Sequence, residues 1–302
     1  MNVVFAGTSD FALTILRGLA DAGHRILCVI CQPDKPKGRK KLLTVCPVKE
    51  YALERSLPLL QPERISDPDS VKEIFLFAAD VFVVAAYGQK IPSSLLHFAP
   101  LGAVNVHGSL LPQLRGAAPI QRAIMNGLKT TGVTTMLMNE GMDTGDMLLR
   151  AETPIYDHDT YGSLSGRLSD MGSALLLETL AGLADGSILP ERQDDSLSTK
   201  APSIKKEDTL ADFSRSAREV YDLIRGLSPS PCARGILAGT EVRLLEARIP
   251  EEDLSFDTPG EIVSAGKEGI RVACGRGSVL ITRLQPAGGK VMDAGAFANR
   301  FH

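Results

Sequence analysis

The sequence predicts a two-domain protein, with a parallel α/β sheet in its first two thirds and a small antiparallel β-barrel after it. Three observations support this fold class. Strand-like apolar runs alternate with helical patterns through the first part of the chain, the periodicity stops in a polar stretch beyond residue 181, and short strand-like runs separated by glycines fill the last third. Alternation of this kind favours a sheet with helices on both faces.

The first domain contains four clear strand-like runs and the helices between them. The strands are expected at Asn2–Ala6, Arg25–Cys31, Val81–Ala85 and Ala103–Val106, and the clearest helices at Phe11–Ala22 and Pro47–Arg55. Ser9 or Asp10 can cap the first helix, because both side chains accept backbone N–H bonds. We therefore expect a Rossmann-like parallel sheet over residues 1–188, with its ligands bound in a cleft beyond the carboxyl ends of the strands.

The second domain is expected to be an OB-like β-barrel over residues 207–302. Asp185-Gly186 and Pro190 end the last helix of the first domain, and the polar residues after them show no periodicity, so a linker is predicted at 189–206. A helix over about Ser214–Leu227 precedes the short strands. These strands are expected at Ala233–Leu237, Glu241–Arg248, Gly260–Ser264, Gly269–Cys274 and Gly277–Leu284.

Composition limits the function classes. A net charge of −3 over 302 residues gives no general attraction to nucleic acid, so such a partner would need a local basic patch. The five cysteines are an odd number and no secretory leader precedes the first strand, which predicts a reduced, cytoplasmic protein. Cys28 and Cys31 have CxxC spacing inside an apolar run and are expected to be core thiols. No apolar run approaches the roughly twenty residues that span a bilayer, so no membrane partner is expected.

A polar cluster in the middle of the chain supplies three kinds of catalytic group. Asn105 and His107 occupy alternate positions of a predicted strand and therefore point to the same face, and Asp143 lies in a turn between Gly141 and Gly145. An amide and an imidazole that converge can stabilise a developing oxyanion, and a carboxylate can hold the imidazole protonated. These residues favour chemistry at a carbonyl carbon, whereas the alternative is a hydrogen-bonded histidine and a turn-forming aspartate with structural roles only.

Two other catalytic interpretations are disfavoured by spacing. The turn from Phe5 to Asp10 lacks the three spaced glycines of a dinucleotide site, and no strand-end acid follows at the expected distance. Ser109 stands only two residues from His107 and outside a GxSxG elbow, so a serine hydrolase is not expected.

A basic segment, Lys35-Pro36-Lys37-Gly38-Arg39-Lys40-Lys41, places five cations in seven residues. Proline and glycine exclude a helix there, which predicts a mobile, exposed loop. The alternative is a solvated run of charge, but the segment follows the second strand. It is therefore expected at the same edge of the sheet as the polar cluster, where the phosphates of a polyanionic substrate would pass.

Several motifs closely resemble those of the 10-formyltetrahydrofolate-dependent formyltransferases. They are Asn105 to Pro112, Arg115 to Ile120 and Gly141 to Leu148, and the segments Phe5 to Ala12 and Ala85 to Pro92 resemble the same superfamily. The basic segment with Gln32-Pro33-Asp34 and Pro47-Val48-Lys49 is similar to the loop that methionyl-tRNA formyltransferases place against the acceptor stem. The resemblance covers the whole chain, strongly to about Gln193, with Leu284 to Gly288 as the best late motif.

The resemblance implies an enzyme that transfers the formyl group of 10-formyltetrahydrofolate to the α-amino group of methionyl initiator tRNA, for translation initiation, without a metal or a covalent enzyme intermediate. It implies catalysis by Asn105, His107 and Asp143. The implied folate site comprises Tyr87, Gly88, Gln89, Lys90, Ile91, Ser109, Leu110, Leu111 and Pro112. The implied tRNA contacts are Lys35, Lys37, Arg39, Lys40, Lys41, Lys205 and Lys206, in a protein expected to be a monomer.

Two alternatives stay open beside this assignment. A formyltransferase of a small amine or a nucleotide sugar would keep the three catalytic residues but has no reason for the basic segment. A non-catalytic RNA-binding protein would need no intact cluster. The chain also departs from its relatives at Ser230, where they often carry an aromatic residue, and in ending at His302 soon after the late motif. The resemblance therefore gives no support for an RNA contact at these two places.

Overall fold

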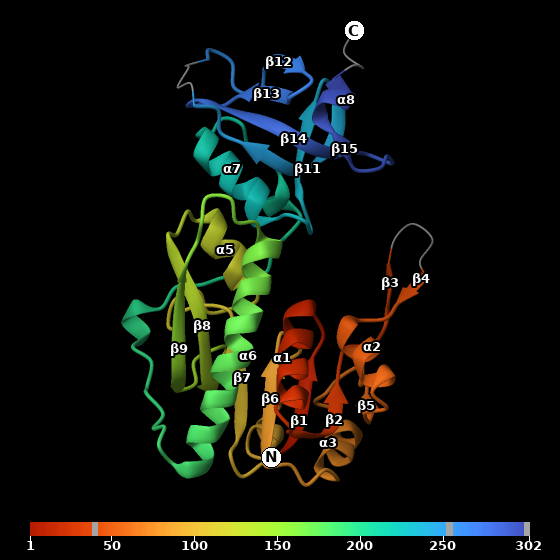
Figure 1. Ribbon diagram of the computed structural model, residues 1–302, viewed down its shortest axis with the longest axis vertical. Coiled ribbons are helices and arrows are strands. Elements are labelled where there is room, and N and C mark those ends of the chain that lie inside the picture. Colours follow the sequence, from red (N-terminus) through yellow and green to blue (C-terminus); the bar gives the residue numbers. More distant parts are fainter. Residues whose placement is uncertain (38–41, 252–255, 299–302) are drawn as a thin grey trace. The chain divides into compact units, whose positions relative to one another are not determined.

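A computed structural model of the chain describes residues 1–37, 42–251 and 256–298 (Figure 1). The chain forms two compact units. Unit 1 comprises Met1–Ala117, Gly132–Thr153 and Ser165–Ala201, and unit 2 comprises Ala118–Thr131, Pro154–Leu164 and the chain from Pro202 onward. Two segments from the middle of the chain therefore belong to the same unit as its carboxyl-terminal third.

Unit 1 is built on a seven-stranded sheet with the order β5-β2-β1-β6-β7-β8-β9. The strands are β1 (Asn2–Gly7), β2 (Arg25–Ile30), β5 (Leu59–Leu60), β6 (Val81–Ala85), β7 (Ala103–His107), β8 (Thr130–Leu137) and β9 (Met147–Pro154). β5, β2, β1, β6 and β7 pair in parallel, which confirms the predicted parallel sheet and brings their carboxyl ends to one edge.

The sheet is mixed rather than wholly parallel. β8 pairs with β7 in antiparallel register, with His107 opposite Thr134, and β9 follows as the edge strand. These two strands were not predicted. Thr131, Thr134 and Thr135 are buried in β8, so the strand lacks the apolar appearance of β1 and β6.

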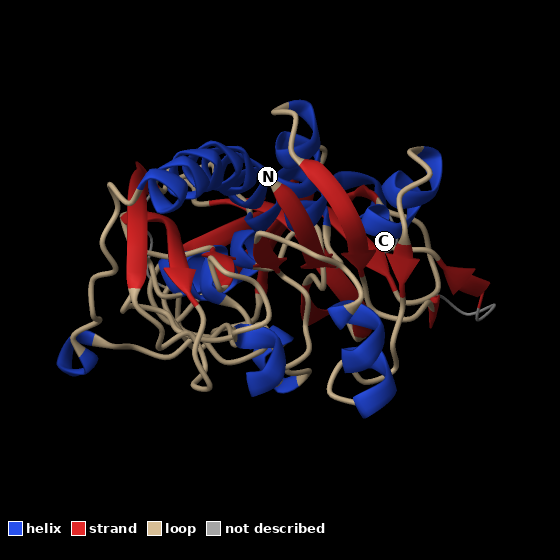
Figure 2. Ribbon diagram, turned by 90° about the horizontal axis from the view of Figure 1, so that it is seen from below, coloured by secondary structure: helices blue, strands red, loops and turns tan. Residues whose placement is uncertain are grey.

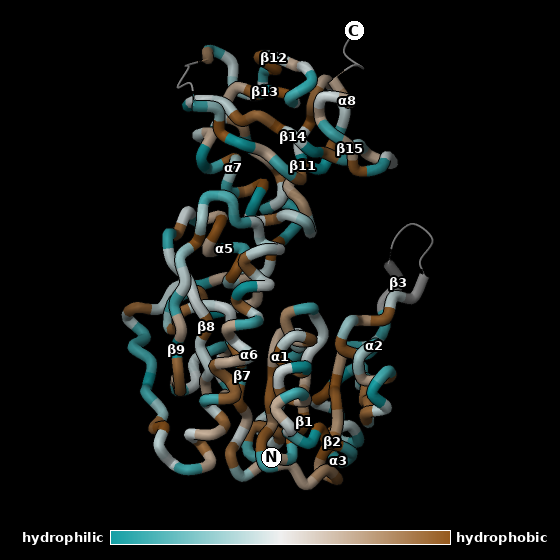
Figure 3. The backbone as a smooth tube through the Cα atoms, viewed as in Figure 1, coloured by the Kyte–Doolittle hydropathy of each residue, from teal (hydrophilic) through white to brown (hydrophobic). Residues whose placement is uncertain are grey.

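Helices lie on both sides of the strands (Figure 2). The helices of the first two thirds of the chain are α1 (Asp10–Asp21), α2 (Pro47–Glu54), α3 (Pro68–Phe75), α4 (Ser93–Leu96), α5 (Pro119–Met125) and α6 (Tyr161–Asp185). The predicted cap is confirmed, because the Ser9 hydroxyl accepts the Ala12 N–H at 3.4 Å. β1, β2 and β6 consist largely of hydrophobic residues (Figure 3) and form part of the core of unit 1. The fully buried Phe5 and Phe82 belong to this core.

The basic segment begins in a strand, and the prediction of an exposed loop was wrong for Lys35–Lys37. β3 (Lys35–Lys37) pairs with β4 (Leu42–Thr44) in antiparallel register, Lys35 opposite Thr44. Cross-strand pairing therefore holds the backbone of Lys35–Lys37 against that of Leu42–Thr44. Arg39, Lys40 and Lys41 lie outside the described residues.

Unit 2 contains an antiparallel sheet with the order β10-β11-β14-β13-β12, and β15 beside β14. Its strands are β10 (Ala233–Leu237), β11 (Thr240–Arg248), β12 (Ile262–Gly266), β13 (Gly269–Ala273), β14 (Ser278–Pro286) and β15 (Met292–Asp293). Helices α7 (Ala217–Gly226) and α8 (Ala294–Ala298) contribute to the same core. The antiparallel β-domain is confirmed, and its closure into an OB-like barrel stays a prediction.

The predicted linker at 189–206 contains tertiary structure. Met147 and Glu191 form an antiparallel bridge, and Arg115 and Lys200 a parallel one, so the chain as far as Ala201 packs within unit 1. Short 3-10 helices form at Asp195–Leu197 and Glu207–Thr209. The unit boundaries thus differ from a division at residue 188, because single long-range bridges leave no periodicity in the sequence. Within the described residues, no helix is both long enough and apolar enough to cross a membrane.

Candidate active site

The polar cluster begins on β7, whose last residues carry Asn105 and His107. Both side chains are nearly buried, with 8% and 6% of their surface exposed. Alternate strand positions place them on one face of the sheet. Within the part of the chain that the structure describes, the Asn105 carboxamide forms no hydrogen bond, so its donor and acceptor remain available to a ligand.

The His107 ring is fixed by contacts on both nitrogens. Its Nε2 lies 3.0 Å from the Leu114 carbonyl oxygen. A carbonyl only accepts, so Nε2 carries a hydrogen. Nδ1 lies 3.8 Å from Asp143 Oδ2. The ring therefore turns Nδ1 toward the carboxylate, at a separation longer than a hydrogen bond.

Asp143 lies in the loop between β8 and β9, with a backbone φ of 54°. Its Oδ2 also accepts the Gly116 N–H at 2.8 Å. A left-handed conformation is uncommon for a residue other than glycine, and here the surrounding contacts maintain it. Two residues later only glycine fits, since a Cβ at Gly145 would overlap the Leu137 carbonyl. The structure thus brings together the three residues that the sequence singled out.

The segment Ser109–Pro112 follows directly after the cluster and is held in place by a neighbouring strand. The Thr134 hydroxyl donates to the Ser109 carbonyl at 2.7 Å and accepts the Leu111 N–H at 3.1 Å. The Ser109 hydroxyl is fully buried and donates to the Gln113 carbonyl at 2.6 Å. Because its hydrogen is committed to that carbonyl, Ser109 is poorly placed to be a nucleophile, in agreement with the sequence interpretation.

The predicted folate segment Tyr87–Ile91 follows β6 at the carboxyl edge of the sheet. The Tyr87 carbonyl accepts from the Thr8 hydroxyl and from Gln32 Nε2, each at 3.1 Å, which ties together the ends of β1, β2 and β6. Gln89 braces the loop, because its Oε1 accepts the Ile65 N–H at 2.9 Å. Lys90 is exposed. The Tyr87 hydroxyl is buried without a partner among the described residues, and burial raises its pKa.

The predicted tRNA-binding lysines fall in both units. Lys35 and Lys37 belong to β3 of unit 1, whereas Lys205 and Lys206 are exposed residues of unit 2. The predicted core thiols Cys28 and Cys31 are buried. Among the described residues, no group of three or more His, Cys, Asp and Glu side chains could hold a metal ion.

Two residues of the predicted linker contact the site and were missed by the sequence interpretation. The Thr199 hydroxyl accepts the Leu114 N–H at 2.8 Å, next to the carbonyl that binds His107. Gln193 is 5% exposed and donates to the carbonyls of Asp143 and Gly145. Both lie in a polar stretch without periodicity. The one feature of the sequence that could have indicated a role for this stretch is that the strong resemblance extends as far as Gln193.

The fold and the site define a class of one-carbon group transferases, and comparison with known proteins gives the same class. The family description "Formyl transferase" matches residues 1–180, and "Formyl transferase, C-terminal domain" matches residues 203–302. The methionyl-tRNA formyltransferase of Trichlorobacter lovleyi is 46% identical over 98% of this chain and 93% of its own. That of Bacillus subtilis is 43% identical over 100% and 95%. The chain therefore belongs to the methionyl-tRNA formyltransferase family.

Solved structures of more distant proteins share the fold. HypX from Aquifex aeolicus in complex with tetrahydrofolic acid superposes with a TM-score of 0.71 at 19% identity, covering 99% of this chain but 47% of that one. A sugar N-formyltransferase from Shewanella sp. gives a TM-score of 0.63 at 21% identity, covering 82% of this chain and 97% of its own.

Proposed function

We propose that this enzyme transfers the formyl group of 10-formyltetrahydrofolate to the α-amino group of methionyl initiator tRNA in the cytoplasm, acting as a monomer. Membership of the methionyl-tRNA formyltransferase family supports the overall reaction. The observation that carries the mechanism is the convergence of Asn105, His107 and Asp143. No covalent enzyme intermediate is required, because the attacking amine belongs to the acceptor substrate.

The reaction is an acyl transfer through a tetrahedral intermediate. The neutral amine attacks the formyl carbon, the carbonyl electrons move to oxygen, and the attacking nitrogen becomes cationic. Loss of a proton from that nitrogen and collapse of the oxyanion then break the bond to N10 of the folate. Tetrahydrofolate leaves with a proton on N10, and a formamide remains on the methionine. The enzyme must therefore stabilise an oxyanion and move one proton.

Asn105 and His107 stabilise the oxyanion. The Asn105 carboxamide has no hydrogen bond to the described protein, so its N–H groups can donate to the developing charge without breaking an existing contact. His107 contributes chiefly the positive charge of its imidazolium, because Nε2 is occupied by Leu114. Removing a donor of this kind typically costs about 10² to 10³ in rate.

Asp143 has two roles in this mechanism. Its carboxylate faces His107 Nδ1 at 3.8 Å and keeps the ring protonated. It also helps to accept the proton that the attacking amine loses, directly or through a water molecule. The Gly116 N–H fixes the oxygen that faces the ring, at 2.8 Å.

The substrates are assigned to the neighbouring segments. Residues 87–91 and 109–112 bind the folate from the carboxyl edge of the sheet. The basic segment, with Lys35, Lys37, Arg39, Lys40 and Lys41, binds tRNA phosphates, and Lys205 and Lys206 add contacts from unit 2. The basic segment alone supplies local positive charge, although the net charge of the chain is −3.

The test is formyl transfer from labelled 10-formyltetrahydrofolate to four acceptors: initiator methionyl-tRNA, elongator methionyl-tRNA, free methionine and an amino sugar nucleotide. We expect transfer to the initiator alone. Transfer only to a small acceptor would keep the chemistry and reject tRNA as the substrate. Failure to transfer to any acceptor, with folded enzyme, would reject the proposed activity.

A further inference from the structure

The segment Gln193–Ala201 of unit 1 forms a brace around the loop that supports the catalytic cluster. Arg115 is bonded to it on both sides, since its N–H donates to the Thr199 carbonyl at 2.9 Å and its carbonyl accepts the Ala201 N–H at 2.7 Å. The adjacent Leu114 and Gly116 are the residues that contact His107 and Asp143. The brace is therefore one residue away from both catalytic contacts.

Gln193 is the buried centre of this brace, and its side chain uses every polar group it has. Nε2 donates to the Asp143 carbonyl at 2.9 Å and to the Gly145 carbonyl at 2.7 Å. Oε1 accepts from Arg115 Nε at 2.9 Å. The guanidinium of Arg115 is held in turn by Asp195, at 2.8 Å from its NH2 group.

These bonds act on a backbone that needs support. Asp143 has a φ of 54°, and such a conformation costs on the order of 1 kcal/mol or more unless its surroundings fix it. The two N–H bonds of Gln193 hold the carbonyls on either side of Thr144, and so determine how the Asp143 carboxylate faces the His107 ring. A side chain that binds only backbone can thus set the geometry of the carboxylate.

We propose that Gln193 is a positioning residue for Asp143, and that it maintains the alignment of carboxylate and imidazole needed for formyl transfer. The inference depends on the catalytic role proposed for Asp143. Gln193 touches no substrate in this proposal, so its effect must pass through Asp143. A displacement of about 1 Å in a catalytic group can lower a rate by about 10²-fold.

The test is a double-mutant cycle with Gln193→Met and Asp143→Ala, measured as kcat and KM for both substrates. Methionine keeps the length of the side chain and removes all three hydrogen bonds. We expect Gln193→Met to lower kcat by about 10-fold to 10²-fold with little change in either KM. In the Asp143→Ala background the same change should have almost no further effect, because the group that it positions is gone.

A matched control is Gln285→Met in β14, where the glutamine Nε2 also donates to a backbone carbonyl, that of Gly289 at 3.0 Å. It should leave kcat near the wild-type value.

If Gln193→Met lowers kcat by the same factor in the wild-type and the Asp143→Ala backgrounds, Gln193 acts on general structure and the inference is wrong. A second variant, Gln193→Glu, keeps the acceptor for Arg115 and should show the same cycle if Gln193→Met folds poorly. If Asp143→Ala alone retains full turnover, the proposed function of Asp143 fails instead.

Discussion

At the scale of single residues, Asn105 combines burial with an unused carboxamide. The side chain forms no hydrogen bond to the described protein, so its donor and acceptor are open to a ligand or to solvent. The catalytic role proposed for Asn105 therefore requires no existing hydrogen bond to be broken.

Asn105→Ala should therefore separate activity from folding. We expect kcat to fall by about 10² to 10³, because one oxyanion donor is lost. The melting temperature should stay close to that of the wild type, because the substitution breaks no bond to the described protein. Enzyme assays and thermal denaturation of the same preparation test both expectations. A large fall in melting temperature with kcat preserved would assign Asn105 a structural role.

Cys46 is the second residue with unusual chemistry. It caps α2, where its sulfur accepts the Lys49 N–H at 3.4 Å. The pKa of Cys46 is lowered to about 6, chiefly by a hydrogen bond from the Cys31 thiol and further by the backbone N–H groups of Lys49 and Val48. The pKa values of Cys28, Cys31, Cys232 and Cys274 are raised, chiefly by burial for all but Cys31, where the bond to Cys46 is the larger cause.

Alkylation by iodoacetamide should thus be fastest at Cys46. The thiolate is the reactive form, so the rate should rise through about pH 6 and level off above it, whereas an ordinary thiol continues to gain reactivity through about pH 8.5. Peptide mass spectrometry after short exposures at several pH values measures this, and Cys46→Ser is the control. A rate at Cys46 that still climbs at pH 8.5 would contradict a lowered pKa.

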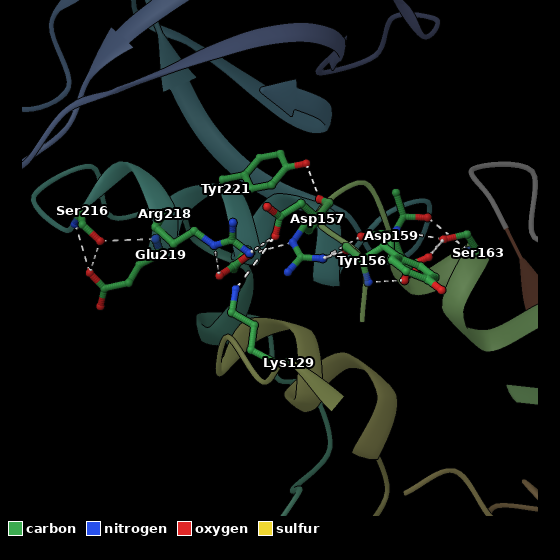
Figure 4. Close-up of polar contacts among 12 residues, drawn as sticks. Lys129, Tyr156, Asp157, Asp159, Ser163, Ser216, Arg218, Glu219 and Tyr221 are labelled. Carbon is green, nitrogen blue, oxygen red and sulfur yellow. Dashed lines mark hydrogen bonds and ion pairs between the residues drawn. The ribbon is translucent and has the colours of Figure 1, made fainter. Parts of the chain in front are cut away.

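At the scale of elements, a cluster of charges joins α7 to the segment between β9 and α6, all within unit 2 (Figure 4). Arg225 donates to Asp222 at 2.6 Å and to the carbonyls of Tyr156 and Asp159 at 3.1 and 3.0 Å. Arg218 binds Asp222 and also the exposed Asp157, at 2.9 and 3.0 Å. This pairing lowers the pKa of Asp157.

Removing one member of the buried pair should be costly. Arg225 and Asp222 are 4% and 3% exposed, and Arg225→Met would leave the buried Asp222 carboxylate and the buried Asp159 carbonyl without this donor. We expect a loss of about 3 to 5 kcal/mol in the free energy of unfolding. Arg283→Met removes an exposed pair with Glu246 and should cost less than about 1 kcal/mol. Urea denaturation of the two variants measures both losses in the free energy of unfolding. Equal losses would show that the buried pair contributes no more to stability than the exposed pair.

The basic segment Lys35–Lys41 should determine the salt dependence of tRNA use. Arg39→Ala should reduce the slope of log kcat/KM against log salt concentration by about one phosphate contact. Lys72→Ala on α3, which removes an exposed cation, is a control expected to leave the slope unchanged. An unchanged slope for Arg39→Ala would exclude a phosphate contact by this residue.

Regular elements were predictable because burial and periodicity coincide in them. β6 and β10 have the bounds expected from their sequence, and Asn105 and His107 could be placed on one face from strand periodicity alone. β8 escaped prediction because buried threonines interrupt its apolar pattern. The brace at Gln193–Ala201 could not be found, because it is held by individual bonds to Arg115 and Leu114, distant in sequence, rather than by a repeating pattern.

At the scale of the whole molecule, the two units do not divide the chain at one point. Ala118–Thr131 and Pro154–Leu164 belong to unit 2, and in that unit Gly226 of α7 packs closely against Met125 and Ile124 of α5. The match to the first family description ends at residue 180, after both of these segments, so it does not separate the two units. A sequence division into consecutive domains could not show this, since α5 and the segment before α6 carry no mark of their later partners.

In the proposed mechanism Asp143 promotes formyl transfer through its negative charge beside His107. The most direct test of this role is the single-turnover rate of formyl transfer by Asp143→Asn, with labelled 10-formyltetrahydrofolate and initiator methionyl-tRNA. Asparagine keeps the size of the side chain and an acceptor for the Gly116 N–H, but it loses the negative charge that faces Nδ1. The mechanism predicts a rate lower by about 10² to 10⁴, with folate binding and thermal stability unchanged. A rate close to that of the wild type would contradict it.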